Sequence, residues 1–224
     1  MSYMQGTFCK PMSKPSLLSP KQRRSADRLE AILAAAERIV SEGGASALTM
    51  RTLGRASGTP QGSLYQYAPT PIAVLQALAD RYAARIEAAL VAALARLPFA
   101  NPLTPDALIA EVVEDLGEAY TSMPAYRELR LALARDPIAA EIENRLDRAI
   151  AETLSPVVAT LDGGALANDL ERTVEALIEI GDAMLGRTLA PADAKRAVID
   201  ARWAMVGYLR MAIDANKQPK GKVG

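Results

Sequence analysis

The stretch ALTMRTLGRASGTPQGSLYQY, residues 47–67, decides the fold of this chain. Thr49 can begin a short helix because its hydroxyl caps free backbone N–H groups, and Gly58 can end that helix in a tight turn through positive φ. Thr59 and Pro60 follow as an N-cap and a first helical residue, so a second short helix runs to the end of the stretch. Two short helices joined by a glycine-containing turn form the helix-turn-helix, whose second helix enters the major groove of DNA.

The sequence on both sides of this stretch is helical in pattern. Apolar residues recur at three- and four-residue spacings over 25–41, where Leu29 is expected to face inward, and again over 70–97. Proline and glycine clusters divide the remainder into five further helices, of which the last two span 165–189 and 192–215. Alanine and leucine are abundant and alternating β-branched runs are missing, so we predict an all-α protein.

The composition excludes several classes of function. The 224 residues contain no histidine and one cysteine, Cys9, so the usual general base and the common imidazole or thiolate metal sites are missing. There is also no glycine-rich phosphate loop. We therefore expect a protein that is not an enzyme and that has no metal and no cofactor. No apolar run is long enough for a membrane span or a secretion signal, so we expect a cytoplasmic protein without a membrane partner.

The charge of the chain is unevenly distributed. The net charge is zero overall, but the residues up to Pro69 contain nine Lys and Arg against four Asp and Glu, and the rest contains 17 against 22. Basic side chains supply most of the sequence-independent affinity for DNA, because they neutralise phosphates. The basic N-terminal part therefore indicates a nucleic-acid partner.

Residues 24–90 resemble the N-terminal domain of the TetR/AcrR family of transcriptional regulators. The positions that match this family by type and spacing are Thr49, Gly58, Gly62, Ser63, Leu64, Tyr65 and Tyr67. The resemblance implies a regulator, in most cases a repressor, that is released from a palindromic double-stranded DNA operator by a small-molecule effector. Three positions depart from the family pattern: Gln61 stands for the usual Lys, Ala68 for the usual Phe, and Pro71 for a phosphate-binding Lys.

Candidate DNA contacts follow from the motif and from the basic arm. Gly62 allows close backbone approach, Ser63 and Gln66 can donate to bases or phosphates, and the hydroxyls of Tyr65 and Tyr67 can reach phosphates. The full set of candidates is Arg23, Arg24, Thr49, Arg51, Thr59, Gln61, Gly62, Ser63, Tyr65, Gln66, Tyr67 and Thr70.

The second part of the chain carries a weaker signal. The last two helices have apolar residues on arcs too broad for one core-facing stripe, which indicates either a second subunit or complete burial within a monomer. The family resemblance implies a homodimer through these helices. The interface candidates are Leu177, Met184, Leu185, Trp203, Val206 and Ile213. The candidates for an apolar effector pocket are Tyr120, Met123, Tyr126, Arg130 and Leu133.

Together these patterns predict four segments: a flexible basic arm over 1–24, a three-helix DNA-binding domain over 25–69, a helical effector-binding and dimerisation domain over 70–216, and a flexible tail over 217–224. Two alternatives stay open. One is an enzyme in the helical domain, against which the missing histidine argues. The other is a helical interaction protein whose helix-turn-helix no longer binds DNA, which the departures at Gln61 and Pro71 favour and the basic N-terminal part opposes.

Overall fold

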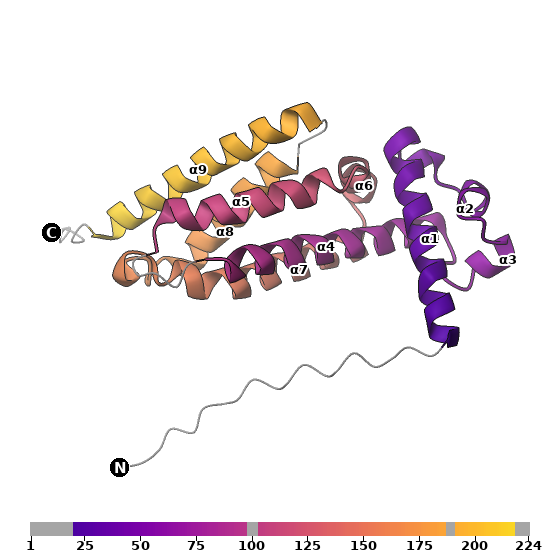
Figure 1. Cartoon of the computed structure of the whole chain (residues 1–224), viewed down its shortest axis with the longest axis horizontal. Coiled ribbons are helices and arrows are strands. Elements are labelled where there is room, and N and C mark those ends of the chain that lie inside the picture. Colours follow the sequence, from indigo (N-terminus) through magenta and orange to yellow (C-terminus); the bar gives the residue numbers. More distant parts are fainter. Residues whose placement is uncertain (1–19, 98–102, 187–190, 218–224) are drawn as a thin grey trace, which may run out of the picture.

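The computed structural model describes residues 20–97, 103–186 and 191–217, and these residues form helices joined by turns and short loops, without a β-strand (Figure 1). The predicted all-α fold is confirmed. The N-terminal elements are α1 (Pro20–Gly43), the 3-10 turn η1 (Ala45–Ala47), α2 (Met50–Ser57) and α3 (Gln61–Leu64). The remaining elements are α4 (Pro71–Ala95), α5 (Pro105–Thr121), α6 (Tyr126–Leu133), α7 (Pro137–Val158), the 3-10 turn η2 (Leu161–Gly164), α8 (Leu170–Leu185) and α9 (Pro191–Lys217).

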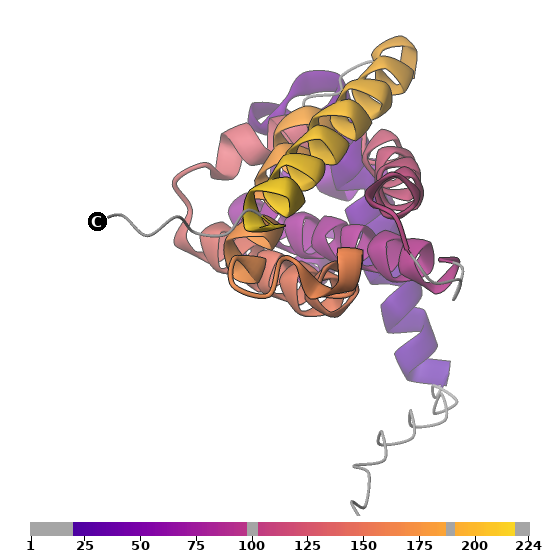
Figure 2. The ribbon, with the colours of Figure 1, turned by 90° about the vertical axis from the view of Figure 1, so that its left-hand side faces the viewer.

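The helices form two unequal groups. Helices α1 to α3 lie at one end of the molecule, and α4 extends from them into a bundle with α5, α7, α8 and α9 (Figure 1). Helix α9 lies along the outside of this bundle, on α5 and α8, in both views (Figure 2). None of the described helices is long and apolar enough to cross a membrane.

A repeated capping device sets where the helices start. The hydroxyl of Thr70 accepts a hydrogen bond from the N–H of Ala73, and Pro71 takes the first helical position. Thr104 and Asp136 cap α5 and α7 in the same way, each followed by proline. Because a capping oxygen satisfies an otherwise free N–H and proline lacks one, the sequence determines these three starts locally.

Several predicted boundaries differ from the structure. Helix α1 begins at Pro20 rather than at Ser25, so the backbone of 20–24 continues the helix instead of belonging to a free arm. Leu29 is 40% exposed, because this early part of α1 extends beyond the helices that could cover it. Helix α8 begins at Leu170 rather than near Ala165, because η2 and a turn precede it.

The recognition segment is also shorter than predicted. Helix α3 ends at Leu64, and residues 65–67 continue as a turn in which the N–H groups of Gln66 and Tyr67 donate to carbonyls three residues earlier. Pro60 rather than Thr59 is the N-cap. A single α-helical turn lacks enough backbone hydrogen bonds to persist by itself, so packing holds this segment in place.

Two hydrophobic cores meet along α4. The first core joins α1, α2, α3 and α6 to α4 as far along as Ile86, and it includes Val74 and Leu78. The second core joins the far end of α4, with Leu90 and Ala93, to the remaining helices of the bundle. Helix α4 is therefore a shared wall of both groups of helices.

A glycine brings α5 and α9 into close contact. A Cβ atom added at Gly117 would lie 2.3 Å from Cγ2 of Val198, a distance that packed atoms do not adopt. Gly117 is buried and helical, so its role is to remove side-chain volume and not to supply an unusual φ. The separation of α5 and α9 depends on this position.

We predict that Gly117→Ala lowers the free energy of unfolding by about 1–3 kcal/mol, because the β-branched Val198 has little freedom to move away from the new methyl group. Urea denaturation followed by circular dichroism measures this change. Gly62→Ala is the matched control, since no atom lies within 4 Å of its added Cβ. Val198→Ala should cost less in the Gly117→Ala background than alone. Equal effects of the two glycine substitutions would contradict the close contact.

Candidate DNA interface and effector pocket

A capping box begins the helix-turn-helix. The N–H of Thr52 donates to the hydroxyl of Thr49 at 3.0 Å, and the N–H of Thr49 donates to the hydroxyl of Thr52 at 2.9 Å. Gly58 ends α2 with φ 63°, as the turn requires. The sequence-based prediction of Thr49 as cap and Gly58 as turn residue is confirmed.

Packing between α2 and α3 orients the recognition segment. Leu53 and Leu64 are buried at the contact. Gly54 allows close approach, because an added Cβ would lie 3.2 Å from the carbonyl oxygen of Thr59 and 3.3 Å from Cδ1 of Leu64. With Leu64 anchored inward, the opposite face turns to solvent, and its exposed residues are Gln61, Gly62, Tyr65 and Gln66. Four of the predicted DNA contacts thus share one exposed surface.

The other predicted DNA contacts fall in different surroundings. The side chain of Thr59 is only 5% exposed, and its burial between α2 and α3 removes it from the contact set. Tyr67 is half-buried, and its hydroxyl lies 3.3 Å from that of Ser25, which links the turn after α3 to α1. Ser63 is also half-buried.

Three further candidates are exposed: Arg51, Thr49 and Thr70. Arg51 forms no hydrogen bond or ion pair with another described residue, whereas both threonine hydroxyls accept helix-capping bonds. The remaining two, Arg23 and Arg24, lie in α1, and their side chains are outside the described residues.

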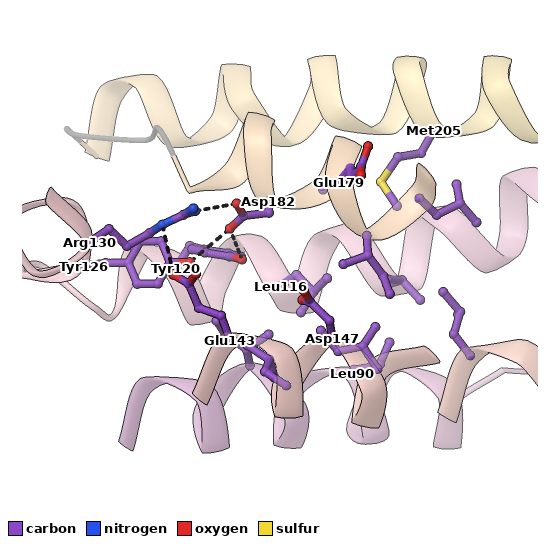
Figure 3. A pocket seen from close by; sticks show the side chains of 18 residues that line it. Leu90, Leu116, Tyr120, Tyr126, Arg130, Glu143, Asp147, Glu179, Asp182 and Met205 are labelled. Carbon is purple, nitrogen blue, oxygen red and sulfur yellow. Dashed lines mark hydrogen bonds and ion pairs between the residues drawn. The ribbon is translucent and has the colours of Figure 1, made fainter. Parts of the chain in front are cut away.

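A cavity of about 160 Å³ lies inside the helical bundle (Figure 3). Its walls are mostly apolar and come from α4 to α9, with Ile86, Leu90 and Met205 among them. Tyr120, Tyr126 and Arg130, predicted as ligand residues, all line it. Such an apolar chamber with a few convergent polar groups is typical of a small-molecule site.

Asp182 organises the polar end of the cavity. Its carboxylate accepts hydrogen bonds from the hydroxyl of Tyr126 at 3.0 Å and of Tyr120 at 3.3 Å, and it forms an ion pair with Arg130 (Figure 3). The Tyr120 and Tyr126 rings meet edge to face, with centroids 5.0 Å apart. Burial, followed by the negative charge of Asp182, raises the pKa of Tyr126, and burial also raises that of Tyr120. Both tyrosines therefore stay protonated and donate.

Two of the five residues predicted for the effector pocket lie outside this cavity. Met123 is 2% exposed and packs in the core that contains α1 and α6, so it does not line the cavity. Leu133 lines a smaller adjoining cavity of about 50 Å³. Four acidic lining residues were missed: Glu143, Asp147, Glu179 and Asp182. The sequence did contain a signal for them. Glu143 and Asp147 are four residues apart and Glu179 and Asp182 are three apart, and both spacings place two side chains on one face of a helix.

Comparison with known proteins identifies the domains. Residues 32–78 match the family model for bacterial regulatory proteins of the tetR family, and residues 103–213 match the model for the C-terminal domain of tetracyclin repressor-like proteins. The chain belongs to the TetR family. Proteins of the TetR family are DNA-binding transcription factors and not enzymes, and the sequence resemblance is thereby confirmed. No curated protein matches the sequence.

Solved structures share the fold of this TetR-family protein at low sequence identity. GusR of Salmonella enterica is 21% identical with a TM-score of 0.65, over 87% of this chain and 98% of its own. A TetR-like transcriptional regulator of Rhodococcus sp. RHA1 is 18% identical with a TM-score of 0.61, over 84% and 97%. The TetR family repressor AlkX of Dietzia sp. strain DQ12-45-1b, implicated in the biodegradation of n-alkanes, is 17% identical with a TM-score of 0.55, over 83% and 96%.

The residues predicted for the dimer interface of this TetR-family protein separate into two groups. Leu177, Leu185 and Ile213 are at most 5% exposed and lie in the core of the subunit, so for them the interface prediction is wrong. The faces of α8 and α9 that carry these three residues point into the bundle. Met184 and Val206 are half-buried, whereas Trp203 is 77% exposed.

Polar contacts join the two domains of this TetR-family protein beside the cavity. The hydroxyl of Tyr82 on α4 donates to Oε1 of Glu37 on α1 at 2.6 Å, and Arg85 lies 3.5 Å from the same oxygen. Burial and this hydrogen bond raise the pKa of Tyr82, so its hydroxyl remains a donor. The Tyr82 ring lies 6.1 Å from that of Tyr126, a cavity residue. Side chains therefore connect the cavity to α1 without a gap.

We predict that Tyr82→Phe lowers the free energy of unfolding by about 1.5–3 kcal/mol, because it removes a buried hydrogen bond to a charged carboxylate. Chemical denaturation with urea measures the change. Tyr65→Phe is the control, since Tyr65 is 50% exposed and should change stability by less than about 0.5 kcal/mol. If both substitutions have the same small effect, the Tyr82 hydroxyl does not stabilise the domain contact.

Proposed function

We propose that this TetR-family regulator is a repressor that binds a palindromic operator as a homodimer and leaves it when a small molecule occupies the cavity. The observation that carries the proposal is the exposed surface of the recognition segment. Gln61, Gly62, Tyr65 and Gln66 face solvent while Leu64 anchors the segment in the core. This is the arrangement that a helix entering the major groove needs.

The chemistry of that surface suits a DNA groove. Gln66 can hydrogen-bond to base edges, and the hydroxyl of Tyr65, which accepts only a long 3.4 Å bond from Gln61, is free to donate to a phosphate. Gly62 has no atom within 4 Å of an added Cβ, so the backbone there can approach DNA closely. Arg51 adds a positive charge at the exposed side of α2. These contacts replace the family lysines that are Gln61 and Pro71 in this chain.

We predict that Tyr65→Phe weakens binding by about 1 kcal/mol, roughly fivefold, for every duplex tested, whereas Gln66→Ala changes which duplex is preferred. The probes are labelled duplexes that cover the DNA flanking the protein's own coding region, and fluorescence anisotropy is the measurement. Tyr208→Phe on α9 is the matched control and should leave DNA affinity unchanged. No preference of the native protein for any duplex over a scrambled one would contradict the operator, and the alternative of a helical interaction protein would then be favoured.

An exposed apolar stripe on α9 supports the homodimer. Ile199, Trp203 and Met211 are 48%, 77% and 74% exposed, and they recur at intervals of four or eight residues, so they lie on one face of the helix. Gly207 lies between them on the same face and has no neighbour within 4 Å of an added Cβ. A monomer seldom leaves such a row in water. A second copy can pack its own α9 here by two-fold symmetry.

We predict that Trp203→Glu converts the protein from dimer to monomer at micromolar concentration, because an aromatic anchor at an interface centre typically contributes 2 kcal/mol or more. Light scattering after size exclusion should change from about twice the 23.9 kDa chain mass to that mass itself. Leu131→Glu is the control, since Leu131 is 63% exposed and belongs to α6, not to the α9 stripe. A native protein that is monomeric under these conditions removes the proposed interface.

Two helices connect the cavity to the DNA-binding helices, and through them an occupied cavity can control DNA binding. Helix α6 contributes Tyr126 and Arg130 to the cavity and also packs against α1 and η1. Helix α4 contributes Ile86 and Leu90 to the cavity and continues through Pro71 to the recognition segment. An effector that binds differently in two arrangements of these helices shifts the DNA-binding equilibrium by that difference in affinity.

A further inference from the structure

The cavity carries an unbalanced charge that indicates what kind of molecule it accepts. Its lining includes the four carboxylates of Glu143, Asp147, Glu179 and Asp182, and Arg130 is the single basic residue among the described residues that line it. A solvent-facing groove between α7 and α8 adjoins this lining at Asp147, Ile178 and Glu179. Beyond those shared residues the groove carries Glu171 and Glu175 against Arg148.

The positive charge of Arg130 is already matched within the protein. Arg130 forms ion pairs with Asp182 and, at 3.7 Å, with Glu143, and the bond to Asp182 raises its pKa although burial opposes this. An anionic ligand has to displace Asp182 from Arg130, which leaves the Asp182 carboxylate without its cationic partner beside a second negative charge. Removing one member of such a network is costly, so Arg130 is a poor receptor for an anion.

The carboxylates nearer the groove have no such partner. Asp147 and Glu179 form no hydrogen bond or ion pair within the part of the chain that the structure describes. Both side chains are exposed to solvent. Partial desolvation of Asp147, together with the charges of Asp182, Glu143 and Glu179, raises its pKa. A cation beside Asp147 relieves this repulsion, whereas an anion increases it.

We propose that the effector is a cationic amphiphile, a protonated or quaternary amine on an apolar or aromatic body, with its body in the cavity against Tyr120 and Tyr126 and its charge beside Asp147 and Glu179. The apolar chamber defines the site, and the charge of its lining selects the ligand. The inference rests on the proposed role of the cavity as the effector site.

Three probes with one body test the charge: 4-phenylbutylamine, 4-phenylbutanol and 4-phenylbutyrate, titrated into the full-length protein by isothermal calorimetry at pH 7. We expect the amine to bind about tenfold more tightly than the alcohol and the carboxylate most weakly, because four carboxylates against the one guanidinium of Arg130 leave a net charge of 1 − 4 = −3 on the lining. Added salt should weaken binding of the amine, strengthen binding of the repelled carboxylate and leave the alcohol unchanged.

Conservative variants test the assignment to particular residues. Asp147→Asn with Glu179→Gln should lower amine affinity about tenfold and leave alcohol affinity unchanged, since the volume of the site is retained. Glu152→Gln is the control, because Glu152 is exposed on the same helix α7 and lines neither the cavity nor the groove. Circular dichroism verifies that each variant is folded.

The outcomes separate this inference from the proposed function. Tightest binding of the carboxylate, equal binding of all three probes, or no binding of any probe overturns the cationic effector. Operator binding measured by anisotropy without a probe decides the DNA-binding role independently. An amine-selective protein without operator affinity would retain the cation site and lose the repressor proposal, and the reverse result would retain the repressor and remove this ligand class.

Discussion

The rest of the structure depends on helix α4 serving two hydrophobic cores at once. Its first half packs with α1, α2 and α6, and its second half packs with the bundle, so neither core is complete without it. Protein interiors are close-packed, and a helix held on both sides cannot bend gradually to suit one of them. The DNA-binding helices are therefore positioned by the same residues that close the second domain. The fixed start of α4 at Thr70 and Pro71 extends this constraint to the recognition segment.

Polar contacts then specify how the domains meet. Apolar packing alone permits sliding of α1 along α4, because apolar contacts have little directionality. The hydrogen bond from Tyr82 to Glu37 has a definite length and direction, and an ion pair joins Arg81 to Glu30 at 2.6 Å, two turns away on α1. Tyr82 is buried, so its hydroxyl has to keep this partner, and the interface therefore has one register.

Local signals predicted the N-terminal fold and failed where distant segments meet. The cap at Thr49 and the turn at Gly58 depend on neighbours within a few residues, so their chemistry is legible in the sequence. Asp182 bonds to Tyr120 and Tyr126, which are 62 and 56 residues away, and no periodic pattern encodes that pairing. The same limit explains Leu177: an apolar arc shows that a helix face is covered, but not whether its own subunit or a partner covers it.

The two helices that join the cavity to the DNA-binding domain differ in how much it costs to move them. Helix α4 buries eight residues, whereas α6, with eight residues in all, buries two, Leu129 and Leu133. Burial of a leucine is worth about 1.5–3 kcal/mol, and coupling between an effector and DNA is typically about 1–3 kcal/mol. Exposing one of the two leucines of α6 therefore costs about as much free energy as such coupling supplies, whereas exposing the eight buried residues of α4 costs far more. In the proposed regulation, α4 would therefore tilt as a rigid body that keeps its contacts, and α6 would be the element that changes its packing.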